Sequence, residues 1–173
     1  MRTFLIVSGV ITISAYAIFG GFMMNVWAVV AASEVPLETV ITDMEAVGES
    51  YAPMSGFVFA ALGIGLALLW ALLVVKSGKG MRVWEPVMLW ALILALGAVA
   101  YFVISFGNLN AVGDTYADWN MEAAWKLERP LYLISLAALG IAIAAPITSF
   151  AINRRRQKSA APPHGSNETS TQI

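Results

Sequence analysis

The feature that most constrains this chain is a short basic loop, Lys76–Arg82, which lies between two long apolar runs. The loop holds three of the ten Lys and Arg residues, and the two runs beside it hold none. Such a loop cannot lie in hydrocarbon, and positively charged loops stay on the cytoplasmic side of a bilayer. We therefore predict two hairpins, each of which leaves the cytoplasm and returns to it.

The apolar runs number four, and each is long enough to cross a bilayer as a helix; they cover about residues 3–32, 54–75, 86–106 and 131–152. Four spans place all the basic clusters on one side, namely Arg2, Lys76–Arg82 and Arg154–Lys158. We predict an all-α, polytopic membrane protein in a bacterial-type cytoplasmic (plasma) membrane, with both termini cytoplasmic. Its four-transmembrane-helix bundle would occupy residues 1–158. Residues 159–173 are rich in Pro, Ser and Thr, which predicts a disordered tail.

The two external segments are acidic and are predicted to carry short amphipathic helices. In the first, apolar residues recur at helical spacing over Pro36–Val47, and Gly48 follows as a stop signal. In the second, Gly107–Arg129, a helix over Thr115–Leu127 would place Asp114, Asp118 and Glu122 on one face. Pro130 then suits the first turn of the last span.

Composition excludes several classes of function. With 59% hydrophobic and 12% charged residues, the chain is too apolar for an ordinary soluble domain and has no basic surface for nucleic acid. It has no cysteine, and its only histidine, His164, lies in the polar tail. We therefore expect no cofactor and no metal centre built on His or Cys. No nucleophile elbow or phosphate-binding glycine loop is present, so we expect no catalytic residues and favour a protein that is not an enzyme.

Polar residues inside the predicted spans are few and mild. None of the four runs has an ionisable group at its middle, which argues against an ion-coupled transporter or a proton pump. Ser8, Thr12 and Tyr16 are four residues apart and form a stripe on one helix face, and Tyr101 lies in the third run. The stripe suits hydrogen bonds between helices. The alternative is an intramembrane polar face that receives a lipid or quinone headgroup.

The external acidic residues form a candidate interaction surface. Its members are Glu45, Glu49, Asp114, Asp118 and Glu122. Carboxylate oxygens could bind a divalent cation, and the excess negative charge would attract a basic protein. A solvated acidic face without a partner is the simpler interpretation.

Two segments of seven residues match each other, one in each external loop. Residues 46–52 and 111–117 share five identities, and the other two positions are Glu/Asp and Ser/Thr exchanges. A helix that ends at glycine explains part of the match, but not the tyrosine at the same offset in both copies (Tyr51 and Tyr116). We therefore hypothesise an internal duplication of the hairpin, with each tyrosine hydroxyl near the acid of its own copy, Glu49 or Asp114.

Small residues spaced by four in the second span suit close packing between membrane helices. We expect the partners to be membrane lipid and other membrane proteins. The function that we predict is a small non-enzymatic accessory, assembly or scaffold subunit of a larger membrane complex. The alternative is a protein that handles lipids or small molecules, as a transporter or a cofactor-free membrane enzyme. A buried cavity lined by Ser8, Thr12, Tyr16 and Tyr101 would favour the alternative.

Overall fold

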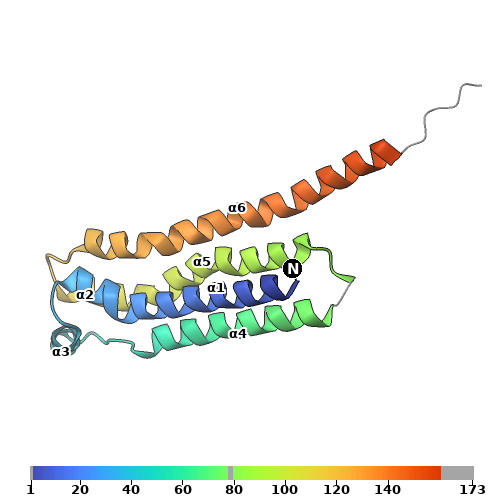
Figure 1. The fold of residues 1–173 in the computed structure, drawn as a ribbon. Helices are drawn as coiled ribbons and strands as arrows, with labels where there is room; N and C mark the ends of the chain where they lie inside the picture. The colour runs from blue at the N-terminus through green and yellow to red at the C-terminus, as the bar shows by residue number, and fades with distance from the viewer. Residues whose placement is uncertain (1, 78–79, 161–173) are drawn as a thin grey trace, which may run out of the picture.

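The computed structural model of the protein describes residues 2–77 and 80–160, and for residues 156–160 it describes the backbone alone. Within this part of the chain all the helices pack into one bundle, and four of them are long and apolar enough to cross a membrane. The predicted all-α, four-span fold is thus confirmed. Figure 1 shows the long helices running side by side, with α6 on one flank of the bundle. Most of the predicted disordered tail lies outside the described residues.

The first span consists of α1 (Arg2–Phe22), a π-helical segment η1 (Met23–Trp27) and α2 (Ala28–Ser33). It packs closely on α4 (Met54–Lys76) because glycines face each other at the contact. A Cβ atom at Gly21 would lie 2.6 Å from the carbonyl oxygen of Gly56. Only glycine lets the two backbones approach this closely.

Two buried asparagines fix the chain segment that leads into α4. Oδ1 of Asn25, in η1, accepts a hydrogen bond of 2.9 Å from the backbone N–H of Gly56, and its Nδ2 donates to the carbonyl of Pro53. Oδ1 of Asn108, in α5, accepts one of 2.8 Å from the backbone N–H of Ala52. Both asparagines therefore satisfy backbone groups that no regular helix pairs.

The helix α3 (Leu37–Val47) confirms the predicted amphipathic helix, and the side of the membrane on which it lies stays a prediction. Pro36 precedes its first turn, and Gly48 ends it with a φ of 85°, a left-handed conformation that favours glycine. Its apolar residues Val40 and Met44 are fully buried. The helix is thus packed on the end of the bundle, where Figure 1 shows it close to α2.

The second external segment differs from the prediction. The third long helix, α5 (Trp84–Thr115), continues well past the predicted end at Phe106, and α6 (Met121–Ala160) begins after a short break. A single helix over Thr115–Leu127 was therefore the wrong interpretation. The helix continues because its last turns bury Ala111 and Val112 in the core.

The break before α6 is organised by Asn120. Its Oδ1 accepts a hydrogen bond of 3.0 Å from the backbone N–H of Ala123, which caps the start of α6. Its own backbone N–H donates to the carbonyl of Ala32 at 2.7 Å, at the end of α2. Pro130, predicted to begin the last span, instead lies inside α6. The residues before it remain helical because they are capped at Asn120 and pack on the bundle, and membrane helices tolerate an internal proline.

Charge is divided between the two ends of the bundle. Figure 1 places the N-terminus, the α4–α5 connection and the C-terminal half of α6 towards one end, and α2, α3 and the α5–α6 connection towards the other. The basic end is tied together by Arg2, which donates a hydrogen bond of 2.8 Å to the carbonyl of Val74 near the end of α4. A cation at this place also suits the negative end of the helix dipole.

Candidate functional site between α5 and α6

A buried carboxyl group, Glu128, is the starting point of the candidate site. One face of α6 turns inward and carries its buried residues at intervals of three or four, namely Ala124, Glu128, Leu131, Ser135, Ala138 and Ala142. Glu128 belongs to this mostly apolar face, so its side chain points into the bundle and is only 5% exposed. It also belongs to a helix, Met121–Arg155, that is long and apolar enough to cross a membrane, and it precedes the long apolar run of that helix by three residues. Ionisable groups in such places are costly, and they commonly mark function.

Glu128 is held by a tyrosine of the neighbouring helix. The hydroxyl of Tyr101, in α5, donates a hydrogen bond of 2.7 Å to Oε1 of Glu128. Tyr101 is fully buried, and its ring packs edge-on against Phe59 and Tyr132, with centroids 5.9 and 6.0 Å apart. Packing on both sides thus fixes the hydroxyl that orients the carboxyl group.

A second polar contact lies two helical turns further along α6. Oγ of Ser135 is 2.9 Å from the hydroxyl of Tyr16, in α1, and it donates a hydrogen bond of 2.7 Å to the carbonyl of Leu94 in α5. Ser135 can therefore serve as donor to Leu94 and as acceptor from Tyr16. This contact ties α1, α5 and α6 together beneath Glu128.

Glu128 also borders a cavity of about 690 Å³ between α5 and α6. Oε1 is occupied by Tyr101, and no described residue forms a hydrogen bond with Oε2. The lining is mostly aromatic and apolar: Phe102, Ser105, Phe106, Leu109, Asn110, Gly113, Asp114, Trp119, Met121, Ala124, Trp125, Glu128 and Tyr132. Its volume lies within the range of small-molecule sites in proteins, which is about 300–1,000 Å³.

The predicted intramembrane polar face is divided in the structure. Tyr16 and Tyr101 are buried in the bundle, and both rings pack against Phe59, at 6.4 and 5.9 Å between centroids. Ser8 and Thr12 hydrogen-bond carbonyl groups of their own helix, and Thr12 is exposed. The two tyrosines therefore lie together, whereas the other two residues are not part of the candidate site.

The residues of the predicted acidic surface lie on three helices, α3, α5 and α6, and in the segments that follow α3 and α5. Glu45 is exposed on α3, and Glu49 lies just after that helix. Asp114 accepts a hydrogen bond of 2.9 Å from Asn110, Asp118 is exposed in the break between helices, and Glu122 pairs with Lys126 at 2.8 Å. Among the described residues, no three acidic, His or Cys side chains are close enough to hold a metal ion. A role in binding a basic protein stays a prediction.

The two matched loop segments end differently. Gly48 terminates α3, whereas Gly113 lies inside α5, against the ring of Trp119. The tyrosine hydroxyls also have partners other than those we expected. Tyr51 donates to the carbonyl of Asn25, and Tyr116 donates to Oδ2 of Asp43 at 2.6 Å. The shared sequence therefore serves two different local structures, and the duplication stays a hypothesis.

Glu128 was missed in the sequence because it was assigned to the external segment before Pro130. The available signal was the spacing of four, three and four between Ala124, Glu128, Leu131 and Ser135. That pattern crosses the proline without interruption.

Comparison with family models, with curated proteins and with solved structures finds no match to this chain.

Proposed function

We propose that the protein binds a small amphiphilic molecule with a cationic group, in the cavity between α5 and α6. This is a protein of the lipid- or small-molecule-handling class, the alternative considered above. The observation that carries the proposal is the buried Glu128 on the wall of an aromatic cavity of about 690 Å³. Keeping a carboxyl group at this depth costs free energy, which a bound cation would offset.

The chemistry of the lining supports a cationic ligand. Glu128 and Asp114 contribute carboxyl groups, and no Lys, Arg or His belongs to the lining. Aromatic rings supply much of the remaining surface, from Phe102, Phe106, Trp119, Trp125 and Tyr132. The faces of such rings attract cations, by about 0.5–2 kcal/mol for each contact. An anionic amphiphile of the same size would be repelled by the carboxylates.

We further propose that the basic end of the bundle faces the cytoplasm of a bacterial-type cell, with both termini inside. The proposal rests on the distribution of Lys and Arg between the connections. The cavity would then lie towards the external side of the cytoplasmic membrane. The accessory-subunit role stays a prediction, because the exposed apolar side chains along the spans are also what lipid contact requires.

The test uses two ions of the same shape and opposite charge, tetraphenylphosphonium and tetraphenylborate. The full-length protein is reconstituted in nanodiscs of zwitterionic lipid, and quenching of tryptophan fluorescence reports binding, since Trp119 and Trp125 line the cavity. We expect saturable binding of the cation and none of the anion. Glu128→Gln should weaken binding about tenfold or more, which corresponds to about 1.4 kcal/mol. The glutamine oxygen can still accept the hydrogen bond from Tyr101, so the fold should be preserved.

Asp118→Asn is the matched control, because Asp118 is an exposed carboxylate of the same region that does not line the cavity. It removes one negative charge and should leave the affinity unchanged. If both variants lose the same affinity for the cation, the effect comes from surface charge in general, and the proposal is contradicted. Saturable binding of tetraphenylborate with similar affinity would contradict it as well.

A further inference from the structure

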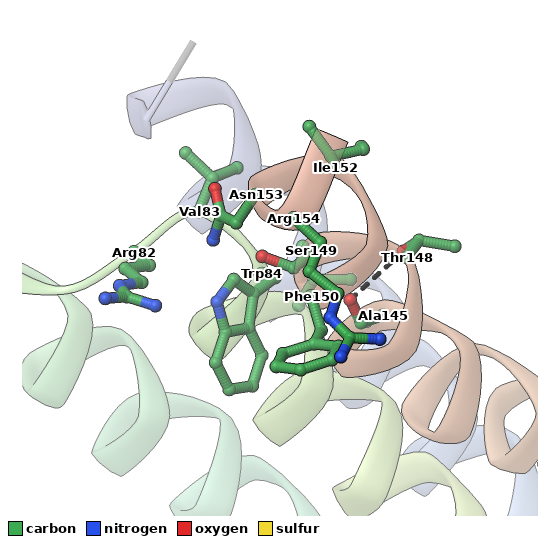
Figure 2. Close-up of a pocket in the computed structure, with 11 residues that line it drawn as sticks. Arg82, Val83, Trp84, Ala145, Thr148, Ser149, Phe150, Ile152, Asn153 and Arg154 are labelled. Carbon is green, nitrogen blue, oxygen red and sulfur yellow. Dashed lines mark hydrogen bonds between the residues drawn. The ribbon is translucent and has the colours of Figure 1, made fainter. Parts of the chain in front are cut away.

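A second cavity, of about 940 Å³, lies at the opposite end of the α5–α6 contact. Figure 2 shows its lining, which comes from the residues just before α5, the first turn of α5 and the last turns of α6. Its charged residues are two arginines, Arg82 before α5 and Arg154 in α6. No Asp or Glu belongs to the lining. The charge of this cavity is thus opposite to that of the candidate site.

An unpaired donor belongs to the same lining. Nε1 of Trp84 is shielded from solvent and has no hydrogen-bond partner among the residues that the structure describes. A buried donor without an acceptor is unfavourable, so such groups in proteins usually have a partner. Asn153 and Ser149 add polar groups to the wall. The lining thus holds at least one donor, Nε1–H of Trp84, that has no acceptor among the described residues.

In Figure 2 the two arginine side chains lie on opposite sides of the lining, with the rings of Trp84 and Phe150 between them, so positive charge borders the cavity from both sides. The guanidinium carbon of Arg154 lies 5.6 Å from the centre of the Phe150 ring, which holds the charge at the wall. The nearest acidic residue in sequence, Glu85, uses Oε2 to accept a hydrogen bond of 2.9 Å from the backbone N–H of Arg82. Within the described part of the chain, neither guanidinium forms an ion pair.

We propose that this cavity binds the phosphate headgroup of an anionic phospholipid. Arg82 and Arg154 would supply the positive charge, and Nε1–H of Trp84 would donate to a phosphate oxygen. Apolar side chains of the lining, among them Val83, Val87 and Ile152, suit the start of an acyl chain. Basic pockets between membrane helices are known lipid-headgroup sites, and this one lies at the basic end of the bundle.

The proposal is tested by mass spectrometry of the intact full-length protein in a non-ionic detergent. Phosphatidylglycerol and phosphatidylcholine with identical acyl chains are added in equal amounts, and the bound fraction of each is measured. We expect the anionic lipid to be retained preferentially. The double variant Arg82→Gln/Arg154→Gln should reduce its retention about tenfold or more, since charge-assisted contacts to both arginines are lost.

Arg155→Gln is the matched control, because Arg155 is an exposed arginine beside Arg154 that does not line the cavity. It should leave retention unchanged, and an equal loss in this variant would overturn the proposal in favour of unspecific attraction. Trp84→Phe keeps every charge and removes one donor, so we expect a loss of about fivefold. If the double variant does not fold, Trp84→Phe alone tests the proposal. Full retention of phosphatidylglycerol by Trp84→Phe would then overturn it.

A last comparison separates the lipid from free phosphate. Inorganic phosphate is added in large excess to the complex with phosphatidylglycerol. Continued retention supports a lipid site, in which apolar contacts contribute to binding. Complete displacement would overturn the lipid assignment, because the cavity would then recognise a free anion.

Discussion

The hydroxyl of Tyr101 lies 2.7 Å from Oε1 of Glu128, so a hydrogen bond joins α5 and α6 inside the apolar bundle. Both side chains are buried. The pair therefore contributes to holding the α5–α6 contact while Oε2 remains available to the cavity. The proposed ligand binding can therefore be tested separately from stability by mutation.

The first prediction concerns this hydrogen bond. Tyr101→Phe leaves the buried carboxyl group without its donor and should lower the free energy of unfolding by about 1–2 kcal/mol. Glu128→Leu should also destabilise, because it leaves the tyrosine hydroxyl unpaired. The double variant should lose less than the sum of the two, since replacing both partners by apolar groups removes both unpaired atoms. Unfolding by a denaturing detergent measures all three.

Tyr132→Phe is the control for that cycle. Its ring packs against Tyr101, but no described residue forms a hydrogen bond with its hydroxyl. We expect a change below about 0.5 kcal/mol. Strict additivity of Tyr101→Phe and Glu128→Leu would show that the two groups do not interact.

The second prediction concerns the contact between α1 and α4. In Gly56→Ala the new methyl group would collide with the carbonyl of Gly21 and with the side chain of Asn25. Overpacking against a backbone atom should cost about 1–3 kcal/mol. Gly65, in the same helix, faces open space, and a methyl group added there would meet no neighbouring element within 4 Å. Gly65→Ala should therefore be neutral or stabilising by up to about 1 kcal/mol. Unfolding in a denaturing detergent compares the two variants, and equal losses would contradict the prediction.

The third prediction concerns alkaline pH at the end of the bundle that carries α3. Burial, together with the hydrogen bond and charge of Asp43, raises the pKa of Tyr116 from 10.0 to about 12. Because the pKa is higher in the folded state, the stabilisation is fully present below pH 10 and is lost as the pH rises towards 12. The midpoint temperatures of thermal unfolding of the parent protein and of Tyr116→Phe should therefore differ below pH 10 and become equal near pH 12. A constant difference across this range would contradict the expected linkage.

The fourth prediction concerns orientation in the membrane. The chain has no cysteine, so a single introduced thiol has no background. Ser50→Cys, after α3, should react in intact cells with a thiol reagent that cannot cross membranes, and Ser77→Cys, after α4, should not. Both positions are exposed at the surface of the protein. Labelling of Ser77→Cys from outside would reverse the arrangement that we propose.

The spans and α3 could be predicted because their signals are local. Long apolar runs, Pro36 before a helix and Gly48 after it each act within a few residues. The continuation of α5 past Phe106 could not be predicted in this way, since Asn108 and Asn110 look like the start of a loop. What keeps this segment helical is tertiary: Asn108 pairs with Ala52, and Ala111 is buried against the core.

Most of the candidate site could not be predicted from the sequence, for a related reason. Pro130 was interpreted as the start of a span, which placed Glu128 outside the bundle. The cap at Asn120, however, starts α6 earlier, and a membrane helix can continue through a proline. The cavity itself depends on how α5 and α6 separate, and no local pattern contains that information. Tyr101 was chosen from the sequence as a polar residue within a span, but its partner was not.

The hydrogen bonds between Asn108 and Ala52 bear on how the protein is made. Asn108 accepts from the N–H of Ala52 and donates to its carbonyl, at 2.8 and 3.3 Å, although 56 residues separate the two. Asn108 lies in the second hairpin, which is synthesised after the first. The N–H and carbonyl groups of Ala52 therefore lack this partner until α5 has been synthesised. Assembly of the first half of the chain is thus completed only by the arrival of the second.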